Sequence, residues 1–124
     1  MKLVISSTGQ DLDASIDPRF GRCSYYIAYD TEKMTFEVVE NKSRNATGGA
    51  GIQASQTVAD LNADAVITTN IGPNAFRVLE AAGIKVYSGV TGTVKQAIEE
   101  FKKGSLGTTE KPNVDEKFGM GGSN

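Results

Sequence analysis

The sequence predicts one mixed α/β domain, in which a three-strand antiparallel meander is followed by parallel βαβ units and helices pack on a mixed five-stranded sheet. Two observations predict this fold class. The N-terminal third holds apolar and aromatic runs separated by short polar turns, which is typical of neighbouring antiparallel strands. From residue 48 onward, apolar residues at helical spacing alternate with short apolar runs, which is typical of parallel strands covered by helices.

The predicted meander has three strands. Residues 3–7 are rich in β-branched side chains and residues 24–29 are rich in aromatic side chains, so both are predicted to be central strands. Residues 34–39 alternate in polarity after the turn at residues 30–33. This third strand is therefore predicted to form an antiparallel hairpin with the second.

The parallel part of the sheet is predicted from residues 65–68 and 84–87, which are short apolar runs. Three helices alternate with these strands, and each has one apolar face that must pack on the sheet. The three predicted faces are Ala54, Val58 and Leu61; Ala75, Val78, Leu79 and Ala82; and Val94, Ala97, Ile98 and Phe101.

Two glycines predict where helices end. Gly83 and Gly104 follow the last apolar residue of a helical pattern, where a left-handed C-terminal cap favours glycine. The periodicity stops after Leu106. The sequence thus predicts an α/β domain at residues 1–106, followed by a flexible tail containing Gly, Lys and Ser at residues 107–124.

Composition excludes several classes of function. The 13 basic and 15 acidic residues give a net charge of -2, so we expect no nucleic-acid partner. Cys23 is the only cysteine, which excludes an intramolecular disulfide and favours a reducing compartment. The apolar run at residues 3–5 is too short for a signal peptide or a membrane span. We therefore expect a cytoplasmic protein with no membrane partner.

Three glycine-containing loops precede the predicted helices, at residues 47–51, 70–74 and 88–93. Ligands of open α/β sheets bind where strands end and helix N-termini offer unpaired N–H groups, so these loops predict an anion-binding rim. Tight turns need glycine even without a ligand, and this alternative stays open for each loop. Pro73 and Thr93 are predicted to have structural roles at helix starts. The predicted rim residues are Gly48, Gly49, Gly51, Gly72, Asn74, Gly89 and Gly92.

Residues 49–54 formally match a dinucleotide-binding fingerprint, but the context for such a site is missing. The preceding strand is predicted to end near Val39, so the tight turn from strand to helix is absent. No acidic residue stands at the position that would bind the ribose, where residues 68–70 are Thr, Thr and Asn. We therefore do not expect a dinucleotide site.

Residues 17–23 combine a carboxylate, two guanidinium groups and the only thiol. Arg19 and Arg22 can bind an anionic cluster and would lower the pKa of Cys23, which favours its metal-binding thiolate. Cys23 is therefore the candidate metal ligand. The alternative is structural: Arg19 pairs with Asp17 or Asp13, Phe20 fills the core, and Cys23 is a small buried hydrophobic residue.

Several separated motifs occur together in one order. They are residues 17–23, residues 39–41 leading to residues 48–51, residues 71–76, and residues 83–87 with residues 92–94. With these motifs the sequence resembles the dinitrogenase iron-molybdenum cofactor biosynthesis family over about residues 1–106. The resemblance implies a ribonuclease H-like fold. It also implies an accessory protein that binds, carries or helps to insert an iron-molybdenum or related metal-sulfur cluster.

The sequence departs from this family in one respect. Members that carry the cofactor often have a histidine in or near the glycine-rich loop, whereas this sequence has none. Cys23 alone supplies one thiolate, whereas a metal-sulfur cluster normally requires several thiolate or imidazole ligands. We therefore expect transient, noncovalent binding by Arg19, Arg22 and the glycine loops, with a cluster donor or acceptor protein as partner. A shared site with one Cys23 from each of two chains stays open, as does the oligomeric state.

The sequence leaves one competing function open and argues against two others. The three loops would equally serve a small-anion or phosphate-binding regulatory module without metal. A nuclease is not expected, because residues 2–7 offer no carboxylate for metal ions. We also expect no enzymatic activity, because the common catalytic triads and dyads require histidine.

Overall fold

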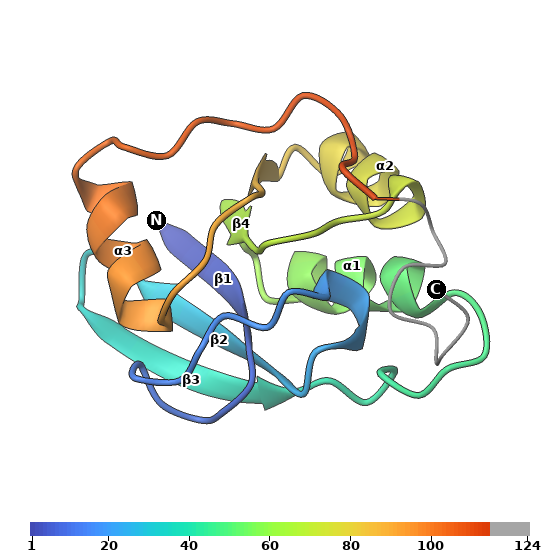
Figure 1. Cartoon of the computed structure of the whole chain (residues 1–124), viewed down its shortest axis with the longest axis horizontal. Helices are drawn as coiled ribbons and strands as arrows, with labels where there is room; N and C mark the ends of the chain where they lie inside the picture. The colour runs from blue at the N-terminus through green and yellow to red at the C-terminus, as the bar shows by residue number, and fades with distance from the viewer. Residues whose placement is uncertain (115–124) are drawn as a thin grey trace.

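The structure is a computed structural model that describes residues 1–114 (Figure 1). A five-stranded sheet has the order β3-β2-β1-β4-β5, antiparallel through the meander and parallel from β1 to β5. This arrangement confirms the predicted fold class. The elements are β1 (Lys2–Ser7), the 3₁₀ turn η1 (Phe20–Arg22), β2 (Tyr25–Asp30), β3 (Thr35–Glu40), α1 (Ala50–Asp60), β4 (Ala65–Ile67), α2 (Pro73–Ala81), β5 (Lys85–Tyr87) and α3 (Val94–Lys102).

The hairpin between β2 and β3 forms as predicted, with a shifted boundary. The Asp30 carboxylate accepts hydrogen bonds from the backbone N–H groups of Glu32 at 2.9 Å and Lys33 at 3.1 Å, which closes the turn. These bonds lower the pKa of Asp30. Met34 has a φ of 58° and belongs to the turn, so β3 begins at Thr35 and not at the predicted Met34.

The core has two layers, one on each face of the sheet (Figure 1). Side chains alternate along each strand, so Val4 and Val66 pack with α1 and α2 on one face. Leu3, Ile5 and Ile67 pack with α3 on the other face. The helices that follow the first two glycine loops are thus separated by the sheet from the helix that follows the third.

The predicted helix ends are confirmed at three positions. Gly83 and Gly104 have φ values of 75° and 73°, in the left-handed region that favours glycine. Thr93 caps α3 through a capping box, in which its side chain accepts from the backbone N–H of Gln96 at 3.1 Å. These local signals therefore set the ends of the helices as the sequence predicted.

The segment after α3 crosses back over the β5 edge of the sheet and reaches the start of α2 (Figure 1). The Thr109 N–H donates to the Val86 carbonyl at 2.7 Å, and the Val114 N–H donates to the Ile71 carbonyl at 3.3 Å. Residues 107–114 are the first part of the predicted flexible tail, whose mobility stays a prediction. Residues 115–124, the rest of that tail, lie outside the described residues.

Among residues 1–114, no helix combines the length and the apolar character needed to cross a bilayer.

Candidate functional site

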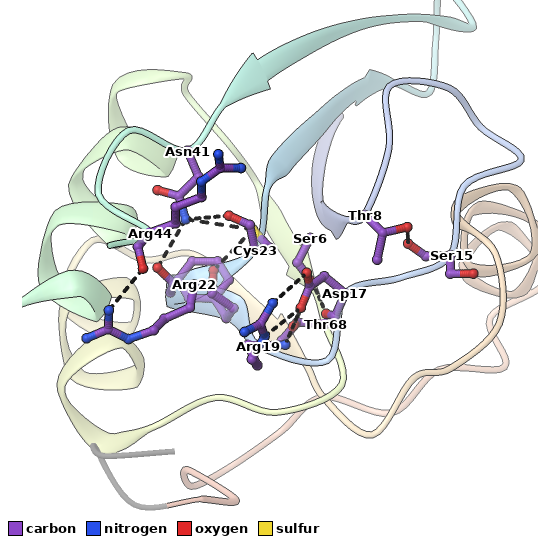
Figure 2. Close-up of polar contacts among 12 residues, drawn as sticks. Ser6, Thr8, Ser15, Asp17, Arg19, Arg22, Cys23, Asn41, Arg44 and Thr68 are labelled. Atoms are coloured by element: carbon purple, nitrogen blue, oxygen red, sulfur yellow. Dashed lines mark hydrogen bonds and ion pairs between the residues drawn. The ribbon is translucent and has the colours of Figure 1, made fainter. Parts of the chain in front are cut away.

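The candidate site begins with a polar junction where β1 and β4 end (Figure 2). The hydroxyl groups of Ser6 and Thr68 lie 2.8 Å apart, and Ser6 also donates to the Asp17 carbonyl at 2.8 Å. The Asp17 N–H donates to the Ser6 carbonyl at 3.0 Å. These bonds fix the start of residues 17–23 at the carboxyl edge of the sheet, where ligands of such sheets bind.

Asp17 and Arg19 form an ion pair at this junction. The buried Asp17 carboxylate accepts hydrogen bonds from the Arg19 backbone N–H at 2.9 Å and from its Nε at 3.3 Å. The Arg19 side chain is 43% exposed, so its guanidinium group still faces solvent. The structural alternative is therefore confirmed for Asp17, and it leaves Arg19 positioned at the surface.

Cys23 is fully buried, and this changes its predicted chemistry. Its thiol donates to the Phe20 carbonyl at 3.4 Å. Burial raises the pKa of Cys23 to about 12, so the predicted lowering of this pKa is wrong. The physical reason is desolvation, which outweighs any nearby positive charge when a thiol has no contact with water. A metal-ligating role for Cys23 stays a prediction, and it would require the loop to open.

The neighbours of Cys23 complete a buried cluster. Phe20 is buried as the structural alternative predicted, and the Tyr26 hydroxyl donates to its carbonyl oxygen. Burial raises the pKa of Tyr26 above its ordinary value. Asn41 donates from Nδ2 to the carbonyl oxygens of Gly21 at 3.0 Å and Cys23 at 2.9 Å. Asn41 thus joins η1 to the loop after β3, a role that sequence reasoning did not assign to it.

The first glycine loop packs directly against η1. A Cβ atom at Gly21 would lie 3.1 Å from both the Cα and the N atoms of Gly51. A Cβ atom at Gly51 would in turn lie 3.3 Å from the Ala75 side chain on α2. Gly21 and Gly51 therefore have a packing role, because they let η1, α1 and α2 approach one another closely.

The other two glycines of this loop differ from Gly51. Gly49 has a φ of 73° and is the N-cap of α1, so the backbone itself favours glycine there. A Cβ atom at Gly48 would meet nothing within 4 Å, and Gly48 is exposed. Neither packing nor a positive φ therefore requires a glycine at position 48.

The second glycine loop is joined to residues 17–23 through Asn70. The Asn70 N–H donates to the Pro18 carbonyl at 3.0 Å, and the Phe20 N–H donates to the Asn70 carbonyl at 3.3 Å. Gly72 is the N-cap of α2 with φ −88° and ψ 174°, a conformation open to any residue. Asn74 lies in the first turn of α2. The structure therefore brings the first two predicted loops and the arginine segment together.

The third glycine loop lies beside the second, but its helix amides are occupied. Gly89 and Gly92 have φ values of 76° and 100°, and the Gly89 N–H donates to the Thr69 carbonyl at 2.8 Å. The N–H groups of Val94 and Lys95 in the first turn of α3 donate to backbone carbonyls of residues 14 and 12 at 2.9 and 2.8 Å. Gly89 and Gly92 thus have conformational roles, and the α3 N-terminus offers little to an anion.

α1 and α2 begin differently from α3. Neither Gly49 nor Gly72 has a side chain that caps its helix. The N–H groups of Ala50, Gly51 and Ile52 find no acceptor within residues 1–114. Such groups carry the partial positive charge of a helix N-terminus, which favours anions.

Three arginines lie in the segments that border this edge, and sequence reasoning missed one of them. Arg22 donates from Nη1 to the Arg44 carbonyl at 2.9 Å, which joins the backbone of Arg44 to the segment that carries the predicted Arg19 and Arg22 (Figure 2). Residues 41–49 contain Lys42 and Arg44 but no acidic residue. That charge bias in a glycine-rich loop was the available sequence signal for Arg44.

The donor groups at this edge are N–H groups, not metal ligands. In the described part of the chain, no three His, Cys, Asp or Glu side chains gather closely enough to hold a metal ion. Arg19, Arg22, Arg44 and the amides of α1 instead supply hydrogen-bond donors near this edge. Chemically, such a set suits an anion that accepts several hydrogen bonds.

Comparison with known proteins gives a consistent picture. The family model described as dinitrogenase iron-molybdenum cofactor matches residues 1–104. An uncharacterized protein of Methanocaldococcus jannaschii, MJ0580, is 33% identical over 94 residues, which span 73% of this chain and 80% of that protein.

Two solved structures share both the fold and the sequence pattern. The apo form of the orange protein from Desulfovibrio gigas is 37% identical with a TM-score of 0.89, covering 91% of this chain and 96% of that one. A NifB-like protein of the DUF35 family from Thermotoga is 39% identical with a TM-score of 0.80, covering 91% and 97%.

The contact between Gly21 and Gly51 predicts a stability effect. Gly21→Ala should lower the free energy of unfolding by about 1–3 kcal/mol, because the added Cβ overpacks against backbone that cannot move freely. Gly48→Ala is the matched control and should change it by less than about 0.5 kcal/mol, since its Cβ meets open space. Urea denaturation measures both, and equal stabilities of the two variants would contradict the close packing.

The buried thiol predicts a pH dependence. Because the pKa of Cys23 rises from 9.0 to about 12 on folding, the unfolded chain releases this proton first as the pH increases. The contribution of the protonated Cys23 thiol to the free energy of unfolding is therefore complete below pH 9. Above pH 9 it falls by about 1.4 kcal/mol per pH unit, until the pH reaches the pKa of the folded state. Denaturation at pH 8 and pH 10 should show a smaller loss for Cys23→Ala than for the wild type. An equal loss would mean that Cys23 is solvated in the native state.

Proposed function

The chain belongs to the dinitrogenase iron-molybdenum cofactor family, and from this premise we propose that it is an accessory protein that binds, carries or helps to insert an iron-molybdenum or related metal-sulfur cluster. The match over residues 1–104 confirms the family that the sequence resembled. One observation carries the proposal beyond membership of the family. Residues 17–23 contact the loops that lead into α1 and α2, so the partly exposed Arg19 and Arg22 lie near α1 amides that have no acceptor within residues 1–114.

The proposed mode of binding is noncovalent. Sulfide and oxide groups on an anionic cluster accept hydrogen bonds, and guanidinium groups donate such charge-assisted bonds strongly. Arg19, Arg22 and Arg44 supply these donors, and the α1 amides add the charge of a helix N-terminus. Gly48 leaves the backbone open to close approach by the cluster.

This mode suits transient carriage of cargo. No bond to a thiolate has to be broken for release, because Cys23 is buried and protonated at neutral pH. A donor protein can therefore load the cluster and an acceptor protein can remove it by competing for the same anion. We propose that the protein acts in the cytoplasm in this way and catalyses no reaction of its own.

A second function uses the same donors. A small-anion or phosphate-binding regulatory module without metal is favoured by the absence of clustered metal ligands in residues 1–114. Phosphate, like a cluster, would accept hydrogen bonds from Arg22, Arg44 and the α1 N-terminus. The two functions differ in what the protein retains when it is purified.

Purification under strict exclusion of oxygen separates the two functions. We expect molybdenum or iron together with inorganic sulfide to copurify with the protein, and to be lost when oxygen is admitted. Metal analysis and sulfide determination on matched aerobic and anaerobic samples measure this. Retained phosphate or nucleotide without metal would favour the regulatory module instead.

The role of Arg44 can be tested with tetrathiomolybdate, a simple molybdenum-sulfur anion. Arg44→Ala should weaken binding about tenfold or more, because one charge-assisted hydrogen bond is worth about 1.5–3 kcal/mol. The free energy of unfolding should barely change, since the exposed Arg44 side chain is not part of the core.

Lys33→Ala is the matched control for Arg44→Ala, because it removes one exposed positive charge from the β2–β3 turn. Optical titration at low and moderate salt should show unchanged affinity for this control. If Arg44→Ala and Lys33→Ala behaved alike, the basic edge would not be the binding site.

A further inference from the structure

The loop between β4 and α2 is the junction on which the proposed site depends. Asn70, at its centre, exchanges two backbone hydrogen bonds with residues 17–23, of 3.0 Å to Pro18 and 3.3 Å from Phe20. These bonds join the segment that carries Arg19 to the start of α2. Whatever fixes the position of Asn70 therefore also fixes the distance between Arg19 and the α2 N-terminus.

Both neighbours of Asn70 are bound by the side chain of Asn113. Asn113 Oδ1 accepts a hydrogen bond from the Ile71 N–H at 2.8 Å, and its Nδ2 donates to the Thr69 carbonyl at 3.0 Å. The Asn113 N–H also donates to the Ile71 carbonyl at 3.1 Å. A side-chain amide has one donor end and one acceptor end, so it pairs with this loop as another backbone strand would.

The segment containing Asn113 is itself held at a second point. Thr109 donates its N–H to the Val86 carbonyl at 2.7 Å, and its hydroxyl accepts from the Ser88 N–H at 2.8 Å. These bonds give partners to backbone groups at the outer edge of β5, which is the edge strand of the sheet. We call residues 107–114 the strap, because they connect this edge to the β4–α2 loop.

The strap lies outside the family match, which ends at residue 104. Without the strap, the backbone groups of Thr69 and Ile71 in the β4–α2 loop would form hydrogen bonds only with water. A loop whose backbone bonds only to water is more mobile.

We infer that Asn113 is a positioning residue, which holds the β4–α2 loop in the conformation that keeps residues 17–23, and with them Arg19, in place for anion binding. This inference rests on the proposed function for its ligand. The positioning itself rests only on the bonds among Asn113, residues 69–71 and residues 18–20. Asn113 touches the loop and acts on the ligand through it.

The test uses the full chain with Asn113→Ala, and Thr108→Ala as the matched control. Both residues are exposed, both lie on the strap, and both substitutions remove a neutral polar side chain. We expect the amide of Ile71 to exchange with solvent about tenfold faster in Asn113→Ala, which corresponds to one lost hydrogen bond. The Phe20 amide should also exchange faster, whereas the core amide of Val66 should not.

Two further measurements separate positioning from general stability. Asn113→Asp keeps an oxygen acceptor at the same place, so the Ile71 amide should stay protected in this variant. Asn113→Ala should bind tetrathiomolybdate about threefold or more weakly, at a temperature where both proteins are fully folded. Thr108→Ala should match the wild type in both measurements.

Several outcomes would overturn the inference. Ile71 and Phe20 amides that exchange equally fast in Asn113→Ala and Thr108→Ala would show that Asn113 does not fix the loop. Faster exchange with unchanged affinity for the anion would show that the loop does not matter for binding. A wild type that fails to bind tetrathiomolybdate overturns the proposed function, and the exchange rates then decide alone whether Asn113 positions the loop.

Discussion

The structure depends on satisfying the polar groups that are buried where β1 and β4 end. Ser6, Asp17 and Thr68 are almost completely inaccessible, and each would destabilise the fold by about 1–3 kcal/mol without a hydrogen-bond partner. Ser6 contacts both other residues, so one hydroxyl fixes the end of each strand relative to the next segment. Within residues 1–114, every buried side-chain nitrogen and oxygen has a partner. The position of residues 17–23 follows from this requirement.

The fixed position of residues 17–23 places some of their functional groups in the interior and others at the surface. Cys23 turns inward, where desolvation keeps its thiol protonated. Arg19 and Arg22 stay partly exposed, and Arg22 reaches the backbone of Arg44. A binding mode based on thiolate coordination is therefore opposed by the same packing that favours one based on guanidinium groups. The absence of histidine from the sequence acts in the same direction.

Patterns that repeat over short distances could be predicted from the sequence. The periodicity of apolar residues predicted the strands and helices, and Gly83, Gly104 and Thr93 predicted helix ends. Both kinds of signal depend only on residues that are close together in the sequence. Cys23 is enclosed partly by Asn41, which is 18 positions away in the sequence. Asn113 acts on Ile71, which is 42 positions away. No local pattern reports such contacts, so the thiol pKa was predicted with the wrong sign and the strap was not recognised.

The three glycine loops show why a helix N-terminus is not by itself an anion site. All three looked equivalent in sequence, since each placed glycine before a helix. α3 satisfies its first amides internally, through the Thr93 capping box and the carbonyls of residues 12 and 14. α1 begins at Gly49, which has no side chain to cap it, so its amides remain available. The helix amides that remain available to an anion therefore lie on the face of the sheet covered by α1 and α2, and Arg22 belongs to the η1 segment that packs against α1.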